Sequence, residues 1–255
     1  MTRVCIAGIT GWVGRPLAEA IAATDDLELV AGVARRAAGE LVSGAPVHGT
    51  IAEALRTEWH VLVEFSGAEA AKTHALAAIA AGRYVVIGSS GLSSEDYEEI
   101  GAAAVEHDVG VAAVGNFTMS AALLQRFAVE AARYLPTWEV TDFASDEKPD
   151  APSGTARELA WRLAHVRAPE TKIPVDQTLG RPDARGADVD GTRVHSIRLP
   201  GYTIGLEVRF GQAEERLTIA YDGGTSAGPY IAGTILAIRR VTTLRGLTRG
   251  LDQLL

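Results

Sequence analysis

Cysteine is nearly absent from this chain of 255 residues, which contains only Cys5. A single cysteine excludes an internal disulfide and any metal site built from several thiolates. Long apolar runs are also missing, because no stretch approaches the roughly 18 residues of a membrane-spanning helix and the apolar segment 4–8 is too short for a signal peptide. We therefore expect a cytoplasmic protein that does not contact a membrane.

An excess of positive charge is lacking as well. Lysine and arginine total 24 against 32 aspartate and glutamate residues, for a formal net charge of −8. Such a chain lacks a generally basic surface for nucleic-acid phosphates, so we expect no nucleic-acid partner. Hydrophobic residues make up 47% of the sequence, which is enough to bury a core and argues against intrinsic disorder. The six histidines show no metal-ligand spacing, and no metal is expected.

The first half of the chain alternates short apolar runs with helical patterns. This alternation is typical of a parallel sheet covered by helices, and it predicts a doubly wound, Rossmann-type α/β domain over residues 1–117. The expected strands are 4–7, 29–33, 61–65, 84–87 and 110–114, and the expected helices are 16–23 and 68–81.

The character of the sequence changes after residue 117. Strand-like alternation at 138–144 is followed by a helical pattern at 156–166, a loop region at 168–190 and strand patterns at 194–199, 203–210 and 216–221. We interpret the last three strands as an antiparallel meander. The prediction is an α+β domain at 118–228 with an antiparallel or mixed sheet, and a C-terminal segment, 229–255, whose helix rejoins the first domain.

Three glycines follow the first expected strand at the spacing G-x-x-G-x-x-G. Gly8, Gly11 and Gly14 lie between that strand and the next helix, where glycine permits a tight turn and a close approach of the backbone to a pyrophosphate. No Gly-Lys-Ser/Thr follows, which excludes a P-loop. We expect a dinucleotide to bind here, with contributions from Thr10, Trp12 and Val13. The alternative is a glycine-rich turn that holds no ligand.

Two arginines follow the second expected strand. Enzymes that prefer NAD usually place an acidic residue there for the ribose hydroxyls, whereas this chain has Arg35 and Arg36. Guanidinium groups offer paired donors to a 2′-phosphate. The pair therefore favours NADPH, with NADH as the second possibility. An ordinary solvated loop is the alternative interpretation.

The string Lys148-Pro-Asp-Ala-Pro-Ser153-Gly154-Thr155-Ala156 precedes the expected helix at 156–166. Hydroxyls and free backbone N–H groups converge at such a helix start, with the positive end of the helix dipole behind them. Together with the cation of Lys148, this arrangement predicts a carboxylate-binding site. The alternative is an N-cap turn with a surface lysine nearby.

Several motifs, in order along most of the chain, resemble the dihydrodipicolinate reductase family. They are the Gly8 turn, Glu64-Phe65-Ser66, Gly88-Ser89-Ser90-Gly91-Leu92, Gly115-Asn116-Phe117-Thr118, Lys148 to Ala156, and Val189-Asp190-Gly191 with residues 194–201. Members of this family reduce a cyclic unsaturated imine dicarboxylate with NAD(P)H. The resemblance implies a homotetramer whose second domain binds the substrate and forms the subunit contacts.

The resemblance also implies roles for individual residues. The nicotinamide side of the cofactor would lie against Phe65, Ser66, Gly88, Ser89, Ser90, Gly115, Asn116 and Phe117. Substrate carboxylates would be held by Lys148, Ser153, Gly154, Thr155 and Arg198.

The chain departs from the family at the histidine pair that precedes the lysine motif. The first of the two imidazoles is regarded as the family's proton donor, and Ala144 and Ser145 stand in their places here. This loss indicates a changed substrate. Hydride transfer to an already protonated iminium needs no separate donor. Where a donor is needed, Lys148, or water held by Ser145 or Asp146, would supply the proton.

Our leading hypothesis is an NAD(P)H-dependent oxidoreductase that reduces a C=N or conjugated C=C bond in a small, carboxylate-bearing substrate of the cyclic-imine type. Lys148 would be both an anchor and a catalytic residue. Two alternatives stay open: an authentic 4-hydroxy-tetrahydrodipicolinate reductase of lysine biosynthesis, and a catalytically silent relative that binds NADPH or a metabolite.

Overall fold

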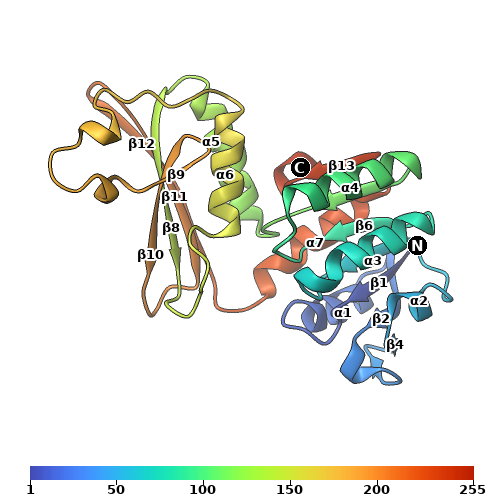
Figure 1. Cartoon of the computed structure of the whole chain (residues 1–255). Coiled ribbons are helices and arrows are strands. Elements are labelled where there is room, and N and C mark those ends of the chain that lie inside the picture. The colour runs from blue at the N-terminus through green and yellow to red at the C-terminus, as the bar shows by residue number, and fades with distance from the viewer. The chain divides into compact units, whose positions relative to one another are not determined.

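The computed structural model describes all residues from 1 to 255. The chain forms two compact units, one made of Met1–Met119 with Ser226–Leu255 and the other of Ser120–Thr225 (Figure 1). We call them unit 1 and unit 2. None of the helices combines the length and the hydrophobicity that crossing a membrane requires.

Unit 1 contains an eight-stranded sheet in the order β13-β7-β6-β5-β1-β2-β4-β3. Every pair in it is parallel except the antiparallel pair β3–β4. Central strands are buried on both faces, which explains their continuous apolar runs. The bounds are β1 Thr2–Ala7, β2 Leu27–Val33, β3 Leu41–Val42, β4 Ala45–His48, β5 Val61–Glu64, β6 Tyr84–Ile87, β7 Gly110–Ala113 and β13 Gly246–Arg249.

Helices follow most of these strands, as the predicted doubly wound α/β fold requires, and this prediction is confirmed. Two of them begin at capping boxes, Thr50 with Glu53 and Ser93 with Asp96, which bond the free N–H groups of the first turn. The α-helices of unit 1 are α1 Gly14–Ala22, α2 Ile51–Ala54, α3 Ala68–Ala80, α4 Ser94–Glu106 and α7 Gly228–Val241. Single turns of 3-10 helix lie at Arg35–Ala37 and Leu251–Leu254.

One apolar core of unit 1 lies between the sheet and the helices α2, α3 and α4. Cys5 packs in it as a small apolar residue. Burial, and to a smaller degree the negative charge of Glu64, raises the pKa of the Cys5 thiol. The thiol therefore stays protonated at neutral pH, which suits a packing residue.

Unit 2 is a five-stranded mixed sheet, in the order β12-β11-β8-β10-β9, with helices on one face. Every second residue of β8 is buried, from Trp138 to Ala144, and these side chains face the helices. The elements are α5 Met119–Ala132, β8 Thr137–Ala144, α6 Gly154–Ala164, β9 Ala187–Val189, β10 Thr192–Arg198, β11 Ile204–Gln212 and β12 Glu215–Gly223, with 3-10 turns at Val175–Gln177 and Pro182–Arg185.

The predicted antiparallel meander is wrong for its first strand. Only β11 and β12 form a hairpin, while β8 lies between β10 and β11 and pairs in parallel with β10. The short link after β10 passes the end of β8, where the Leu199 N–H donates to the carbonyl of Ala144 at 3.2 Å. Alternation in the sequence reveals strands but not their neighbours, which explains the error.

Candidate functional site

The glycine turn of unit 1 is folded too tightly for any side chain. A Cβ on Gly14 would lie 2.1 Å from the carbonyl oxygen of Gly8, and a Cβ on Gly8 would lie 2.5 Å from the carbonyl oxygen of Phe65. Gly8 also has a φ of +79°, and its carbonyl accepts a hydrogen bond of 2.8 Å from the N–H of Gly11. Glycine at these positions therefore allows the backbone of the turn to lie at the ends of β1 and β5.

The start of α1 suits a phosphate group. No side chain caps this helix and its first turn contains no acidic residue, so the positive end of its dipole is not neutralised by the protein. Thr10, Gly11 and Trp12 are exposed beside it, whereas Val13 is buried. The turn and the helix start together meet the requirements for the pyrophosphate of a dinucleotide.

The two arginines lie in the 3-10 turn directly after β2. Both Arg35 and Arg36 are exposed, and neither forms an ion pair with another residue of the chain. Their guanidinium groups are therefore available to a ligand anion. Taken together, the glycine turn and these two arginines fit an NADP-type cofactor.

The predicted nicotinamide residues gather at the ends of β5, β6 and β7. The rings of Phe65 and Phe117 pack with their centroids 5.4 Å apart. Gly88 makes room for this arrangement, because a Cβ there would lie 2.1 Å from the Phe65 ring. The side-chain oxygen of buried Asn116 accepts the N–H of Thr118 at 2.8 Å, which fixes the turn after β7. Gly115 and Ser90 are exposed at the same edge.

Sequence reasoning missed a buried polar network at this edge. Glu64, the last residue of β5, is fully buried, and its carboxylate oxygens bond to Ser66, Ser89 and His74. His74 lies on α3, eight residues after Ser66 in the sequence. The acidic residue at the end of the strand was visible in the sequence, but no motif marked its histidine partner.

In unit 2, the predicted carboxylate site lies at the start of α6. The hydroxyl of Ser153 accepts the N–H of Ala156 at 3.3 Å and so caps the helix. Ser153 and Thr155 are buried, Gly154 is half-buried, and the first turn has no acidic residue. Capped in this way, the helix start keeps the positive end of its dipole for an anion.

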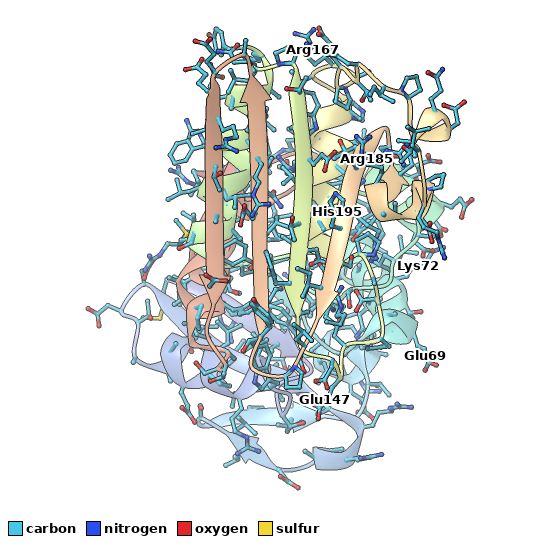
Figure 2. The ribbon with its side chains drawn as sticks, turned by 90° about the vertical axis from the view of Figure 1, so that its left-hand side faces the viewer. Glu69, Lys72, Glu147, Arg167, Arg185 and His195 are labelled. Carbon is cyan, nitrogen blue, oxygen red and sulfur yellow. The ribbon has the colours of Figure 1, made fainter.

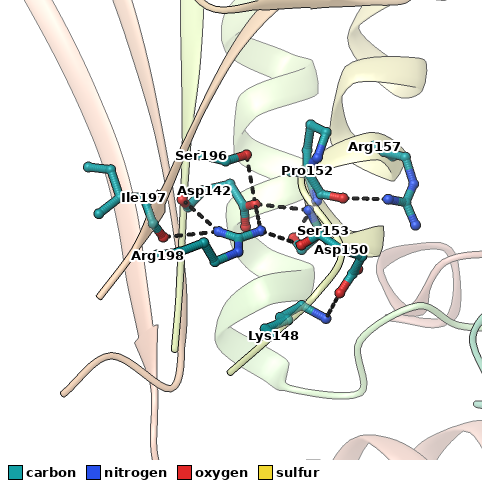
Figure 3. A network of polar contacts seen from close by, with 10 residues as sticks. Asp142, Lys148, Asp150, Pro152, Ser153, Arg157, Ser196, Ile197 and Arg198 are labelled. Carbon is teal, nitrogen blue, oxygen red and sulfur yellow. Dashed lines mark hydrogen bonds and ion pairs between the residues drawn. The ribbon is translucent and has the colours of Figure 1, made fainter. Parts of the chain in front are cut away.

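An ion pair between β8 and β10 fixes this helix start (Figure 3). The Asp142 carboxylate accepts the N–H of Ser153 at 2.8 Å and pairs with the Arg198 guanidinium at 2.7 Å. Arg198 also donates to the backbone oxygens of Asp142, Ile197 and Asp150. Both terminal nitrogens of the predicted substrate ligand Arg198 thus bond to the chain itself.

Lys148 also has a partner within the chain. Its ammonium lies 2.6 Å from the Asp150 carboxylate, and both side chains are partly exposed. Burial works to raise the pKa of Asp150, but the hydrogen bond and charge of Lys148 outweigh it, so the pKa is lowered overall. A substrate carboxylate would have to compete with Asp150 for this ammonium.

Two family models cover nearly the whole sequence. They are dihydrodipicolinate reductase, N-terminus, over residues 2–117, and dihydrodipicolinate reductase, C-terminus, over residues 120–255. The chain belongs to the dihydrodipicolinate reductase family. It is accordingly an NAD(P)H-dependent oxidoreductase, which confirms the predicted enzyme class and cofactor type.

Individual relatives of this reductase match it from end to end. The 4-hydroxy-tetrahydrodipicolinate reductase of Moorella thermoacetica is 37% identical over 265 residues, covering 99% of this chain and 97% of the relative. The enzyme of the same name from Streptococcus sanguinis is 35% identical over 253 residues and covers 99% of each chain. Among solved structures, the dipicolinate-bound dihydrodipicolinate reductase from Paenisporosarcina sp. TG-14 is 28% identical, with a TM-score of 0.84 and 100% coverage of both chains.

The reductase has no imidazole at the end of β8. Ala144 is fully buried there, and the hydroxyl of Ser145 accepts the N–H of Glu147 at 3.3 Å. His195, on the neighbouring strand, pairs with Glu139 at 2.8 Å. Glu139 is an outward-facing residue of β8, so His195 belongs to the opposite face of the sheet from Asp142 and Ala144.

That opposite face carries a hollow of about 1070 Å³. Figure 2 looks onto this face and labels Arg185 and His195 there. The hollow is lined by Glu139, Arg185, Arg193 and His195 among others, and by none of the predicted substrate residues. Its basic side chains are largely paired, because Arg185 and His195 both bond to Glu139.

Two aromatic residues lie together beside the glycine turn. The Trp12 side chain is 57% exposed, and its ring meets the Tyr230 ring edge to face with centroids 5.6 Å apart. Burial raises the pKa of the Tyr230 hydroxyl, which therefore stays protonated. Trp12 was predicted at the dinucleotide site from the sequence, but Tyr230, at the start of α7, carried no signal.

Proposed function

We propose that this reductase is a 4-hydroxy-tetrahydrodipicolinate reductase that uses NADPH in preference to NADH. The observation that carries the proposal is the anion cradle of unit 2, which we define as Ser153, Gly154 and Thr155 at the start of α6 together with Lys148. The cradle offers a helix dipole, hydroxyls and one ammonium to a dicarboxylate. End-to-end relatives with that name support the same substrate class.

The cradle would hold the two carboxylates of the substrate in different ways. One carboxylate would accept the hydroxyls of Ser153 and Thr155 and the backbone N–H groups of Gly154 and Thr155, because the Ser153 N–H already donates to Asp142. The other would take the Lys148 ammonium in place of Asp150, which pairs with it at 2.6 Å in the free enzyme. Arg198 would act on the substrate through the backbone that it holds in position.

Unit 1 would hold the cofactor. The pyrophosphate would bind at Gly8, Gly11 and Gly14 and the 2′-phosphate at Arg35 and Arg36, while the nicotinamide side would lie along residues 65–66, 88–90 and 115–117. When bound, the reduced nicotinamide supplies a hydride to an electron-poor carbon. The protein contributes binding, orientation and a defined electrostatic environment.

Lys148 is also our candidate for the proton donor. The other cations of this region, Arg157 and Arg198, are guanidinium groups, which do not release a proton in proteins. Ala144 and Ser145 offer no imidazole, and Ser145 and Asp146 can at most orient a water molecule. An iminium substrate that arrives protonated would lessen the need for any donor.

A second candidate is a reductase of another cyclic imine that bears a carboxylate. The replacement of the family's histidine pair by Ala144 and Ser145 favours it, because the groups that contact one face of the substrate are changed. Assembly into a homotetramer also stays a proposal, which light scattering of the purified protein would test.

The test is NADPH oxidation at 340 nm with the purified full chain. The imine made in situ by dihydrodipicolinate synthase is compared with five- and six-membered cyclic imino acids, each with NADPH and with NADH. We expect the highest kcat/KM for the dicarboxylate with NADPH. A higher value for a monocarboxylate imine would favour the second candidate, and no oxidation of either cofactor with any imine would contradict both.

The role of Lys148 gives a sharper result. Lys148→Ala removes one charge-assisted hydrogen bond of about 1.5 to 3 kcal/mol, so kcat/KM should fall about 10- to 150-fold. Lys172→Ala is the matched control, because Lys172 is an exposed lysine of the same unit outside the cradle. Equal kinetics for the two variants would remove Lys148 from the site.

A further inference from the structure

Glu64 is a fully buried carboxylate that the proposed mechanism does not use. It ends β5 and lies next to Phe65, the residue against which the glycine turn packs. Burying a charge is costly unless hydrogen bonds compensate for it. The bonds around Glu64 therefore indicate what it does.

Four donors surround this carboxylate. Oε1 accepts the Ser66 N–H at 2.6 Å, the Ser66 hydroxyl at 2.5 Å and the Ser89 hydroxyl at 3.2 Å, and Oε2 lies 2.7 Å from Nδ1 of His74. An ionised carboxylate can only accept hydrogen bonds. Both serine hydroxyls must therefore direct their single proton inward, and the His74 tautomer must carry its proton on Nδ1.

This orientation determines what the serines offer to a ligand. Ser66 is exposed and Ser89 is half-buried, so their oxygens reach the edge of the sheet. The Ser89 oxygen also accepts the N–H of Gly67 at 3.0 Å and keeps one lone pair. With their protons bound to Glu64, the two hydroxyls present only lone pairs outward. They suit a ligand group that donates N–H bonds.

The position of these serines indicates which group that is. In a doubly wound dinucleotide fold the two halves of the cofactor lie on opposite sides of the glycine turn. Arg35 and Arg36 follow β2 and suit the adenosine half, so the nicotinamide half lies over β5 and β6, where Ser66 and Ser89 stand. The carboxamide of nicotinamide has an amino group with two N–H donors.

We propose that Glu64 and His74 are positioning residues that fix Ser66 and Ser89 as acceptors for the carboxamide amino group of the cofactor. The enzyme then distinguishes a carboxamide from ring substituents that lack N–H. This inference rests on the proposed cofactor site. It goes beyond that site because it gives Glu64 and His74 a positioning role and makes the Ser66 and Ser89 hydroxyls hydrogen-bond acceptors toward the ligand.

The test compares NADPH with reduced 3-acetylpyridine adenine dinucleotide phosphate, in which a methyl group replaces the amino group. Dissociation constants are measured for both by fluorescence titration of the full chain. Two hydrogen bonds predict that the wild type binds NADPH about 5- to 150-fold more tightly than the analogue. In Ser66→Ala/Ser89→Ala this ratio should fall toward one, because only the affinity for NADPH is lost.

The positioning pair is tested with the same ratio. Glu64→Gln brings an N–H donor into the network and frees a serine hydroxyl to rotate, so the ratio should fall although both serines remain. His74→Gln should lower it as well. His107→Gln, at an exposed histidine that follows α4, is the matched control and should keep the wild-type ratio.

The possible outcomes separate the two proposals. If neither NADPH nor NADH binds to the wild type, the proposed function fails. If NADPH binds but the wild-type ratio is near one, or the serine double variant keeps the wild-type ratio, the inference about the carboxamide fails. If Glu64→Gln weakens both ligands equally, the role of Glu64 is structural only and the positioning claim is overturned. Thermal unfolding of each variant verifies that it is folded.

Discussion

Replacing Arg198 by methionine should destabilise unit 2 strongly, because it leaves a buried carboxylate without its countercharge. Asp142 is fully buried, and only 16% of the Arg198 side chain is exposed. The substitution keeps much of the side-chain volume and removes the guanidinium. The remaining donors to Asp142 would be the Ser153 N–H at 2.8 Å and the Ser196 hydroxyl at 3.3 Å.

The magnitude follows from this geometry. Removing one partner of a buried ion pair costs about 3–5 kcal/mol, and the partial exposure of Arg198 places the expected loss near the lower end, at about 3 kcal/mol. For a chain of this size each kcal/mol lowers the melting temperature by about 2–4 °C, so the midpoint should fall by about 6–12 °C. Differential scanning calorimetry at neutral pH measures this shift.

Arg181→Met provides the matched control. Arg181 pairs with Asp183 at 2.6 Å, which is as close as the buried pair, but 82% of its side chain is exposed. Water screens an exposed pair, and we expect no measurable change in melting temperature. Equal shifts in the two variants would refute the claim that burial makes the Asp142–Arg198 pair important. The KM for the substrate should rise only in Arg198→Met, because this pair holds the backbone of Ser153.

Two further predictions concern the glycine turn and the cradle lysine. Gly14→Ala should abolish cofactor binding or folding, because its Cβ would lie 2.1 Å from the Gly8 carbonyl oxygen. The control Gly101→Ala on α4 places its Cβ at an ordinary 3.5 Å from Leu247 and should stabilise the chain by about 0.4–1 kcal/mol. Isothermal titration with NADPH measures the first effect and urea unfolding the second, and an intact cofactor affinity in Gly14→Ala would contradict the first prediction. Lys148→Met should raise the pKa of Asp150, because burial, which raises it, then lacks its main opposing interaction. The lowered pKa means that the pair stabilises the fold above the unfolded pKa of about 3.9 and that this contribution is lost as the pH falls through the folded value. The variant lacks the pair, so its stability should depend less on pH in this range. Carboxyl ¹³C NMR titration follows Asp150, with Lys172→Met as control, and an unchanged titration would show that Lys148 does not set this pKa.

Features formed by residues close in sequence were predicted well. The glycine turn needs only three glycines within seven residues, between a strand and a helix, and the structure has them there. The cradle likewise depends on Ser153 capping the helix that begins at the next residue. In both cases the conformation is decided by backbone sterics and hydrogen bonds within one or two turns, which composition and spacing express directly.

Contacts between distant residues were not predicted. Asp142 and Arg198 meet only because β8 lies beside β10, and that neighbour relation was wrong in the sequence interpretation. Glu64 and His74 are ten residues apart, but the contact requires the end of a strand to face the helix that follows it. Helix α4 was also missed, although its capping box, Ser93 with Asp96, was a usable signal.

The loss of the histidine pair should affect the chemical step more than substrate binding. The parts that shape the cradle are the Ser153 cap, the Asp142 carboxylate and the Arg198 guanidinium, and none of them bonds to Ala144 or Ser145 through a side chain. The cradle can therefore keep its geometry when an imidazole is absent from the end of β8. The positions of the family's histidine pair and the residues that shape the cradle are therefore separate parts of this sheet. We therefore expect a family member without the histidine pair to keep its affinity for the substrate.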